Sequence, residues 1–97
     1  MQLFRKLNWG TNRIEHVARH DIVPDEVEEA VFYDPDHRLR RGPRSEKQRD
    51  QYLYYLYGCT EDGRYLFVVL LDLGHGEAMV VTARDMTKSE RQYYEGR

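Results

Sequence analysis

The stretch that decides the fold is Tyr65-Leu66-Phe67-Val68-Val69-Leu70-Leu71. It combines aromatic and β-branched residues with leucine and contains no charge, which favours a β-strand. A strand that is apolar on both faces is typical of the centre of a sheet. One face is therefore expected to lie under helices, which leaves the other for a different occupant, such as a partner. The run is far too short to cross a bilayer as a helix.

Two further strands are predicted beside this central strand, which we take as Arg64–Asp72. Gln51–Cys59 is rich in tyrosine, and Glu77–Arg84 is rich in β-branched and other apolar residues. Turn-forming residues occupy positions 60–63 and 73–76, so the three segments are expected to form consecutive hairpins.

The N-terminal third is predicted to hold a short strand over Gln2–Trp9 and two helices. The first helix covers Asn12–Arg19, with Thr11 as its N-cap. Its apolar residues recur at helical spacing; they are Ile14, Val17 and Ala18. The second helix begins at Pro24 and ends near Asp34, since the proline that follows disfavours helical geometry. Its buried stripe consists of Val27, Ala30 and Val31.

The remaining segments complete the expected architecture. Residues 38–50 are polar and basic, which indicates a short strand followed by a mobile loop. Thr87 and Glu90 match a capping box, so a short helix is expected from Lys88. The order β-α-α-β-β-β-β-α predicts one α+β domain over residues 1–97, with a mostly antiparallel sheet, two N-terminal helices and a short C-terminal helix.

Charge is nearly balanced, with 15 Lys and Arg against 17 Asp and Glu, which excludes a globally basic nucleic-acid binder. The signs alternate along the chain, however: residues 21–36 hold seven acids and no base, whereas residues 37–49 hold six bases and one acid. Cys59 is the sole cysteine, so no internal disulfide or cysteine-rich zinc cluster can form. With no secretory pattern near the N-terminus, we expect a cytoplasmic protein with no membrane segment.

Two arginines are the main candidates for a catalytic site. Arg64 opens the central strand and Arg84 closes the next one, so a tight hairpin would bring both to the same end of the sheet. A three-residue loop would place them directly opposite on one face, and a two-residue loop would place Arg84 opposite Tyr65. Two converging guanidinium groups favour phosphate binding. The alternative is that each arginine pairs with a nearby acid, such as Asp62 or Asp85.

Acid–base candidates lie on the helices. Glu90 and Tyr94 are four residues apart and so share one helix face near the end of the strand that carries Arg84. Metal-free RNA cleavage by the neighbouring 2′-hydroxyl needs a base, an acid and positive charge. Glu90 has a structural alternative as the capping-box residue, and Tyr94 has one in packing. His16 and His20 are also spaced i, i+4, but the pattern lacks other zinc-site features, so we expect no metal and treat both as candidate proton carriers.

Candidate binding residues are aromatic and basic. Tyr55 and Tyr57 project from one face of their strand, where they could stack on bases or pack in a core or interface. The basic candidates for RNA phosphates or an acidic partner, otherwise a solvated loop, are Arg38, Arg40, Arg41, Arg44 and Lys47.

Several motifs together resemble the BrnT-type toxins. The N-terminal half carries Trp9, Asn12-x-Ile14-x-His16, Arg19-His20 and an acidic helix that starts at Pro24. The C-terminal half carries Gly63-Arg64-Tyr65-Leu66, Thr82-Ala83-Arg84-x-Met86-Thr87 and Glu90-Arg91-x-x-Tyr94. The family often has glycine where Asp21 follows His20 here, and many such toxins are basic.

This resemblance implies a RelE-like fold and the toxin of a type II toxin–antitoxin system. It further implies a cofactor-free, metal-independent endoribonuclease, a hydrolase that inhibits growth. The implied partner is a ribbon-helix-helix antitoxin that also binds DNA, so DNA contact would be indirect. The family pattern carries over onto Arg64, Arg84, Glu90 and Tyr94, and less fully onto His16 and His20.

We therefore expect an RNA-cleaving toxin in which both arginines bind phosphate and Glu90 or a histidine acts as base. Tyr94 would orient substrate or donate a proton. The alternative is a non-catalytic interaction module that forms a homodimer or partner complex through its tyrosine-rich strand. A third hypothesis is direct DNA binding through residues 38–49.

Overall fold

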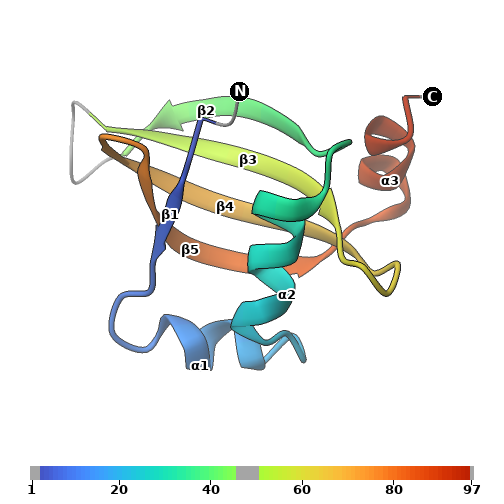
Figure 1. The fold of residues 1–97 in the computed structure, drawn as a ribbon, viewed down its shortest axis with the longest axis horizontal. Coiled ribbons are helices and arrows are strands. Elements are labelled where there is room, and N and C mark those ends of the chain that lie inside the picture. Colours follow the sequence, from blue (N-terminus) through green and yellow to red (C-terminus); the bar gives the residue numbers. More distant parts are fainter. Residues whose placement is uncertain (1–2, 46–50, 97) are drawn as a thin grey trace.

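The strand Tyr65–Gly74 (β4) lies at the centre of a five-stranded sheet with the order β1-β5-β4-β3-β2 (Figure 1). The computed structural model describes residues 3–45 and 51–96. The other strands are β1 (Lys6–Asn8), β2 (Arg38–Arg44), β3 (Tyr52–Cys59) and β5 (Glu77–Asp85). The apolar run thus occupies the centre of the sheet, as its sequence predicts.

Strand pairing is antiparallel from β2 through β5, and only β1 runs parallel to its neighbour β5. The helices are α1 (Arg13–Ala18), α2 (Pro24–Glu28), a π-helical turn η1 (Glu29–Tyr33) and α3 (Lys88–Tyr94). The predicted α+β class and element order are confirmed. The structure also confirms that α3 begins at Lys88, where the Thr87–Glu90 capping box is formed.

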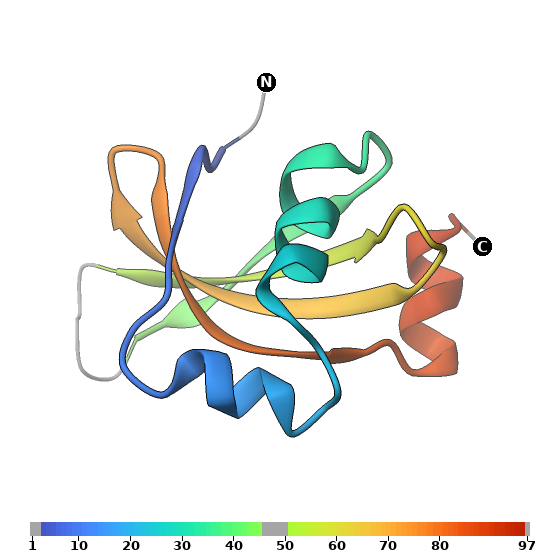
Figure 2. The ribbon, with the colours of Figure 1, turned by 60° about the horizontal axis from the view of Figure 1, so that its bottom comes forward.

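One face of the sheet is covered by α2 and η1, while α1 lies along the β5 edge (Figure 2). Between this face and the helices lies the core, in which alternate residues of β4 and β5 are fully buried. The buried strand residues are Leu56, Leu66, Val68, Leu70, Ala78, Val80 and Ala83. The helical segments contribute Val17, Ile22, Val27, Ala30 and Val31.

Gly58 allows η1 to approach β3 closely. A Cβ atom at this position would lie 2.7 Å from the backbone oxygen of Ala30 and 2.9 Å from its Cβ. Both distances are shorter than van der Waals contact, so any larger residue would force the helical turn away from the sheet. Glycine is therefore required here by packing.

The N-terminal helices differ from the prediction in detail. α1 is shorter than predicted, and its N-cap is Asn12, in left-handed geometry (φ 68°), not Thr11. Only Val17 of the predicted apolar stripe is buried, and Ile14 is 50% exposed, because α1 borders the sheet edge and does not lie across its face. The second predicted helix is divided into α2 and the wider turn η1, which ends at Tyr33 with Asp34 as its C-cap before the proline.

The outer strands also differ in length. β1 covers three residues of the longer strand predicted at the N-terminus, and β2 covers seven residues of the basic segment. The predicted mobile loop falls largely on residues 46–50, so that part of the prediction lies outside the described residues. Within the described ranges, no helix is both long and apolar enough to traverse a membrane.

Candidate functional site

Arg64 and Arg84 lie on opposite faces of the sheet, so the prediction that they converge is wrong. Arg84 is the partner of Phe67, not of Arg64 or Tyr65. The position of the turn displaces the register. The β4–β5 turn is formed by His75 and Gly76, both at positive φ, so β4 extends as far as Gly74. Further along, Leu73 is an extra residue in β4 and Val81 is an extra residue in β5. These two irregularities cancel, so Arg84 keeps the partner that the turn sets.

Arg64 holds the α1–α2 connection against the sheet on the helix-covered side. Its Nε and Nη2 donate to the two carboxylate oxygens of Asp85, at 2.7 and 3.1 Å. The guanidinium also donates to the backbone oxygens of His20 and Asp21, at 3.0 and 2.6 Å, and to the Glu26 carboxylate at 3.3 Å. The hydrogen bond with Asp85 raises the pKa of Arg64, while the same bond lowers the pKa of Asp85. These contacts join the α1–α2 connection to β4 and β5, and they correspond to the alternative of a local ion pair.

Arg84 lies on the opposite face, where Glu90 binds it through two hydrogen bonds of 2.7 and 2.8 Å. The backbone nitrogen of Thr87 donates to the same carboxylate at 2.8 Å, so Glu90 both caps α3 and holds the arginine. The hydrogen bond from Arg84 lowers the pKa of Glu90, which makes this carboxylate a poor proton acceptor. The Arg84 guanidinium carbon lies 4.4 Å from the centroid of the Phe67 ring, and its side chain remains 37% exposed.

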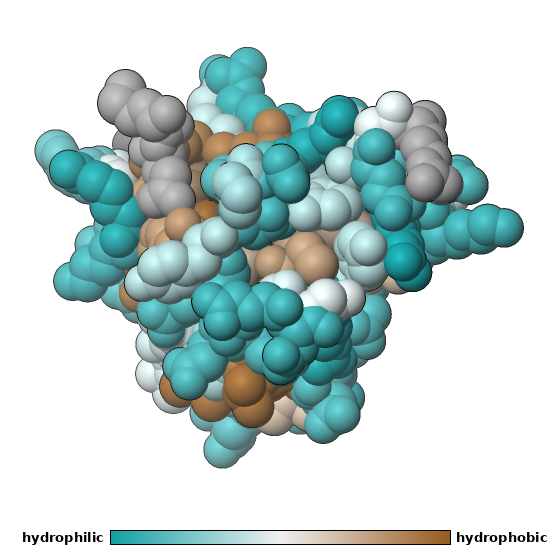
Figure 3. Space-filling model, turned by 45° about the vertical axis from the view of Figure 1, so that its right-hand side comes forward, coloured by the Kyte–Doolittle hydropathy of each residue, from teal (hydrophilic) through white to brown (hydrophobic). Residues whose placement is uncertain are grey.

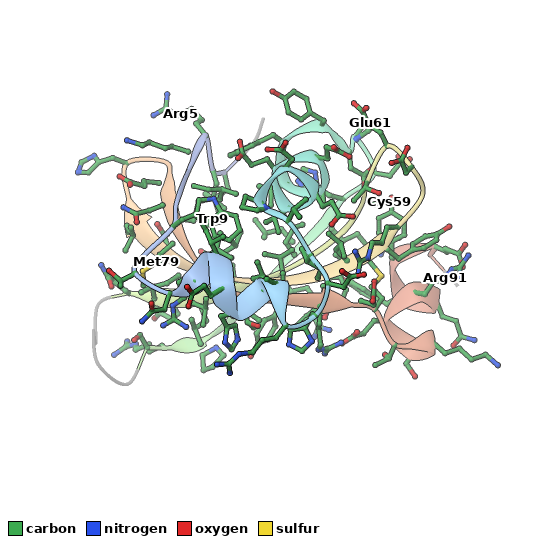
Figure 4. The ribbon with its side chains drawn as sticks, turned by 90° about the horizontal axis from the view of Figure 1, so that it is seen from below. Arg5, Trp9, Cys59, Glu61, Met79 and Arg91 are labelled. Atoms are coloured by element: carbon green, nitrogen blue, oxygen red, sulfur yellow. The ribbon has the colours of Figure 1, made fainter. Side chains whose placement is uncertain are left out.

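The face that carries Arg84 is termed the open face, because α2 and η1 lie on the other side and side chains alone project from its middle (Figure 4). Strand register arranges its residues in rows, since directly paired residues share a face. One row reads Arg38, Tyr57, Phe67, Arg84. The next reads Arg40, Tyr55, Val69, Thr82, and a third reads Leu53, Leu71, Met79.

Aromatic rings form a continuous group on the open face. The ring centroid of Phe67 lies 5.2 Å from that of Tyr57 and 5.6 Å from that of Tyr55. Tyr93 of α3 packs on Tyr57 at 4.8 Å, so Tyr57 is buried at 6% exposure. Tyr55 and Phe67 are only partly buried. Of the two predicted stacking tyrosines, Tyr55 is therefore accessible and Tyr57 mainly packs under α3.

His16 extends the second row of the open face. Its Nε2 lies 3.0 Å from Oγ1 of Thr82, and Nη1 of Arg13, one turn earlier, donates to the backbone oxygen of Val81 at 3.2 Å. The His20 ring centroid is 6.2 Å from that of His16, and His20 is exposed. Among residues 3–45 and 51–96, no group of three or more His, Cys, Asp or Glu side chains is suited to a metal ion.

Tyr94 has a different partner from Glu90, although both lie on one side of α3. Its hydroxyl donates to Oδ2 of Asp34 at 2.7 Å, and the same oxygen accepts the Cys59 backbone N–H at 2.8 Å. Burial, together with the neighbouring Asp34 carboxylate, raises the pKa of Tyr94. The tyrosine therefore joins α3 to the end of η1 and is poorly placed to give up a proton to substrate.

The basic residues of β2 divide between two environments. Arg38 and Arg40 lie over the Tyr93 ring, at 5.0 and 5.4 Å, and belong to rows of the open face. Arg41 and Arg44 instead lie over the Tyr52 ring, at 4.6 and 5.6 Å. All four arginines are exposed, and Lys47 lies outside the described residues.

The structure thus joins Arg84 to Glu90, places His16 in the neighbouring row, and separates Arg64 and Tyr94 from this group. Sequence reasoning missed Thr82 and Phe67 as residues of the site and Asp34 as the buried partner of Tyr94. The i, i+2 spacing of Thr82 and Arg84 on one strand could have placed Thr82 on the same face as the arginine. The contacts of Asp34, in contrast, depend on how the helices pack, which no local pattern specifies. No protein-family model matches the chain, and no curated protein matches it.

Proposed function

We propose that the protein is a metal-independent endoribonuclease of the toxin class that binds single-stranded RNA on its open face. The observation that carries the proposal is the pairing of an accessible aromatic group with Arg84, next to His16 on Thr82. The resemblance to BrnT-type toxins supports the same class independently of this geometry.

Binding is argued from the composition of the rows. Single-stranded bases stack on exposed aromatic rings and on arginine guanidinium planes. Tyr55 and Phe67 supply such rings, and the row through Phe67 begins at Arg38 and ends at Arg84. The phosphates of a strand that follows this row would meet the exposed Arg38 at one end and, at the other, the Arg84 guanidinium that is shared with Glu90. Such contacts predict an affinity that falls with rising salt concentration.

Cleavage is assigned to His16. When Nε2–H donates to Thr82 Oγ1, Nδ1 carries the lone pair that can accept the proton of a 2′-hydroxyl. The 2′-oxygen then attacks the adjacent phosphorus, the bond from phosphorus to the 5′-oxygen breaks, and the departing oxygen takes a proton from the protonated ring of His20 or from water. The products are a 2′,3′-cyclic phosphate and a 5′-hydroxyl. Arg84 stabilises the negative charge that develops on the phosphorane-like transition state.

The activity is tested with end-labelled single-stranded RNA in the presence of EDTA. The wild type is expected to release fragments that end in a cyclic phosphate. His16→Ala should slow cleavage about 100-fold, in the range typical for a general base, with little change in RNA affinity. Arg84→Ala should lower both affinity and rate. The matched control is Arg5→Ala, which removes the same charge beside the β4–β5 turn at the other end of β5.

RNA that stays intact with the wild type, or cleavage that survives in His16→Ala, would reject the catalytic assignment. Binding by gel shift separates the two parts of the proposal, because a bound but uncut RNA would leave an RNA-binding module. Expression of the wild type in a bacterial host should arrest growth. Co-expression of a ribbon-helix-helix protein encoded by an adjacent gene should relieve the arrest. That partner, its indirect link to DNA and a cytoplasmic location are parts of the proposal.

A further inference from the structure

A hollow of about 720 Å³ lies on the open face at the end of the sheet away from α3. Its floor is aliphatic and is formed largely by Leu53, Leu71, Met79 and Val81, with Arg13 and Arg44 among the lining residues. Figure 4 shows Met79 at one end of the sheet and Arg91 of α3 at the other. The α3 end is covered mainly by hydrophilic residues (Figure 3), so the hollow differs from it in character.

The lining does not suit a nucleic-acid base. Tyr55 lies in the neighbouring row and Phe67 in the row beyond it, but no aromatic residue is among the described residues that line the hollow. Bases bind through stacking on rings and through polar contacts to their edges. The hollow offers no ring for stacking, and the leucine, methionine and valine of its floor match the aliphatic side chains of a protein segment.

A second copy of this chain is also a poor occupant. A twofold interface places the same patch of both subunits face to face. Arg13 and Arg44 would then meet Arg13 and Arg44 of the other copy across an apolar surface. The hollow has no acidic side chain among its described lining residues to offset that repulsion.

We infer that the hollow is the docking site for an acidic segment of a partner protein that inserts aliphatic side chains between Arg13 and Arg44. The aliphatic floor would accept leucine, isoleucine or valine, and the two guanidinium groups would pair with flanking carboxylates. The aliphatic floor favours this occupant over RNA, and charge complementarity favours it over a second copy. The inference does not depend on RNA cleavage.

The test uses a displayed library of random 12-residue peptides selected against the wild-type protein. The selected peptides are expected to be enriched in both Asp or Glu and aliphatic residues. Their Kd should rise at least tenfold for Met79→Asp, which removes an apolar contact, and at least threefold for Arg44→Glu, which changes an exposed residue. Arg5→Glu is the control for charge reversal and should leave the Kd unchanged. Circular dichroism verifies that each variant is folded.

Several results would overturn the inference. The hollow does not take such a segment if the selection enriches no peptides or enriches peptides without acidic residues. The same holds if Met79→Asp and Arg44→Glu bind the selected peptides as tightly as the wild type does. Sedimentation as a dimer that Met79→Asp dissociates would assign the hollow to a second copy. Loss of single-stranded RNA binding in both variants, with peptide binding retained, would assign it to nucleic acid. Because RNA cleavage is assayed separately, failure here leaves the proposed endoribonuclease function standing, and the reverse also holds.

Discussion

Nε2 of His16 lies 3.0 Å from Oγ1 of Thr82, and this contact joins α1 to the open face of the sheet. Thr82 pairs with Val69 and is two residues from Arg84 on the same strand, so the histidine is held roughly 6–7 Å along the strand from the position of the arginine. The contact thus holds the His16 ring beside the same sheet face that carries Arg84.

Replacement of the hydroxyl tests this contact. Thr82→Val should lower kcat for RNA cleavage about tenfold while KM changes little, because the ring loses the partner that sets its tautomer and orientation. Thr82→Ser keeps an oxygen and should retain most of the activity. Equal rates for the valine and serine variants in a steady-state assay would show that the hydroxyl has no positioning role.

The two arginines should differ in their effect on stability. Arg64→Ala removes a guanidinium that is bound to two carboxylates and two backbone oxygens, and should lower the free energy of unfolding by about 2–4 kcal/mol. Arg84→Ala removes one ion pair and a ring contact, and should cost about 1 kcal/mol. Urea unfolding followed by circular dichroism measures both. A larger loss of unfolding free energy for Arg84→Ala than for Arg64→Ala would contradict the structural role assigned to Arg64.

Acid should weaken the Glu90–Arg84 pair. The pKa of Glu90 is held below its ordinary value of 4.5 in the folded protein, chiefly by the hydrogen bond from Arg84. Its stabilisation is therefore fully present above about pH 5 and is lost as pH falls through the lowered pKa. Glu90→Gln should be less stable than wild type by about 2 kcal/mol at pH 7, and the gap should narrow below pH 4. A gap that stays constant from pH 7 to pH 3 would contradict the ion pair.

Gly58→Ala should destabilise the fold because the added Cβ would overlap the backbone of Ala30. We expect a loss of roughly 1–3 kcal/mol, in the range of an overpacked core, measured by thermal unfolding. Gly63→Asn is the control, since nothing lies within 4 Å of a Cβ there and asparagine tolerates its positive φ. Equal melting temperatures for Gly58→Ala and wild type would mean that η1 can move away from β3 without cost.

Stacking on the open face is tested with Tyr55→Leu. The substitution keeps an apolar residue but removes the ring, so affinity for single-stranded RNA should fall about tenfold. Tyr33→Leu provides a matched control, because Tyr33 is 72% exposed and belongs to η1 on the other side of the sheet. Fluorescence anisotropy at fixed salt measures both variants, and an equal loss in each would argue against a specific stacking surface.

The sequence predicts the element order well because the strong local signals agree with the tertiary packing. The apolar run at Tyr65–Leu71 lies in the central strand, and the capping box at Thr87 starts α3. The position of Arg84 could not be predicted, because the turn forms at His75 and Gly76, at the far end of the turn-forming segment 73–76, and this register makes Phe67 the partner of Arg84. Gly74, His75 and Gly76 allow more than one two-residue turn, and the choice between them depends on how the two strands pair.

The same limit explains the division of the candidate residues. Arg64 precedes β4 and turns toward the α1–α2 connection, where backbone oxygens of His20 and Asp21 accept its hydrogen bonds. These acceptors belong to the chain backbone and carry no side-chain signature. Spacing singles out both arginines as candidates, but only packing separates the one that holds helices from the one that faces solvent.

The bulge at Val81 also sets how this chain can vary in length. Without the surplus residue, Val80 and Thr82 would follow each other directly, and Ala83 would still point inward and Arg84 outward. One residue can thus be lost from the Val81–Thr82 pair without turning the rest of β5 over. Loss of a further residue between Thr82 and Arg84 would turn the arginine toward the core. Deletions in β5 should therefore be tolerated at the bulge and destabilise the fold on its C-terminal side.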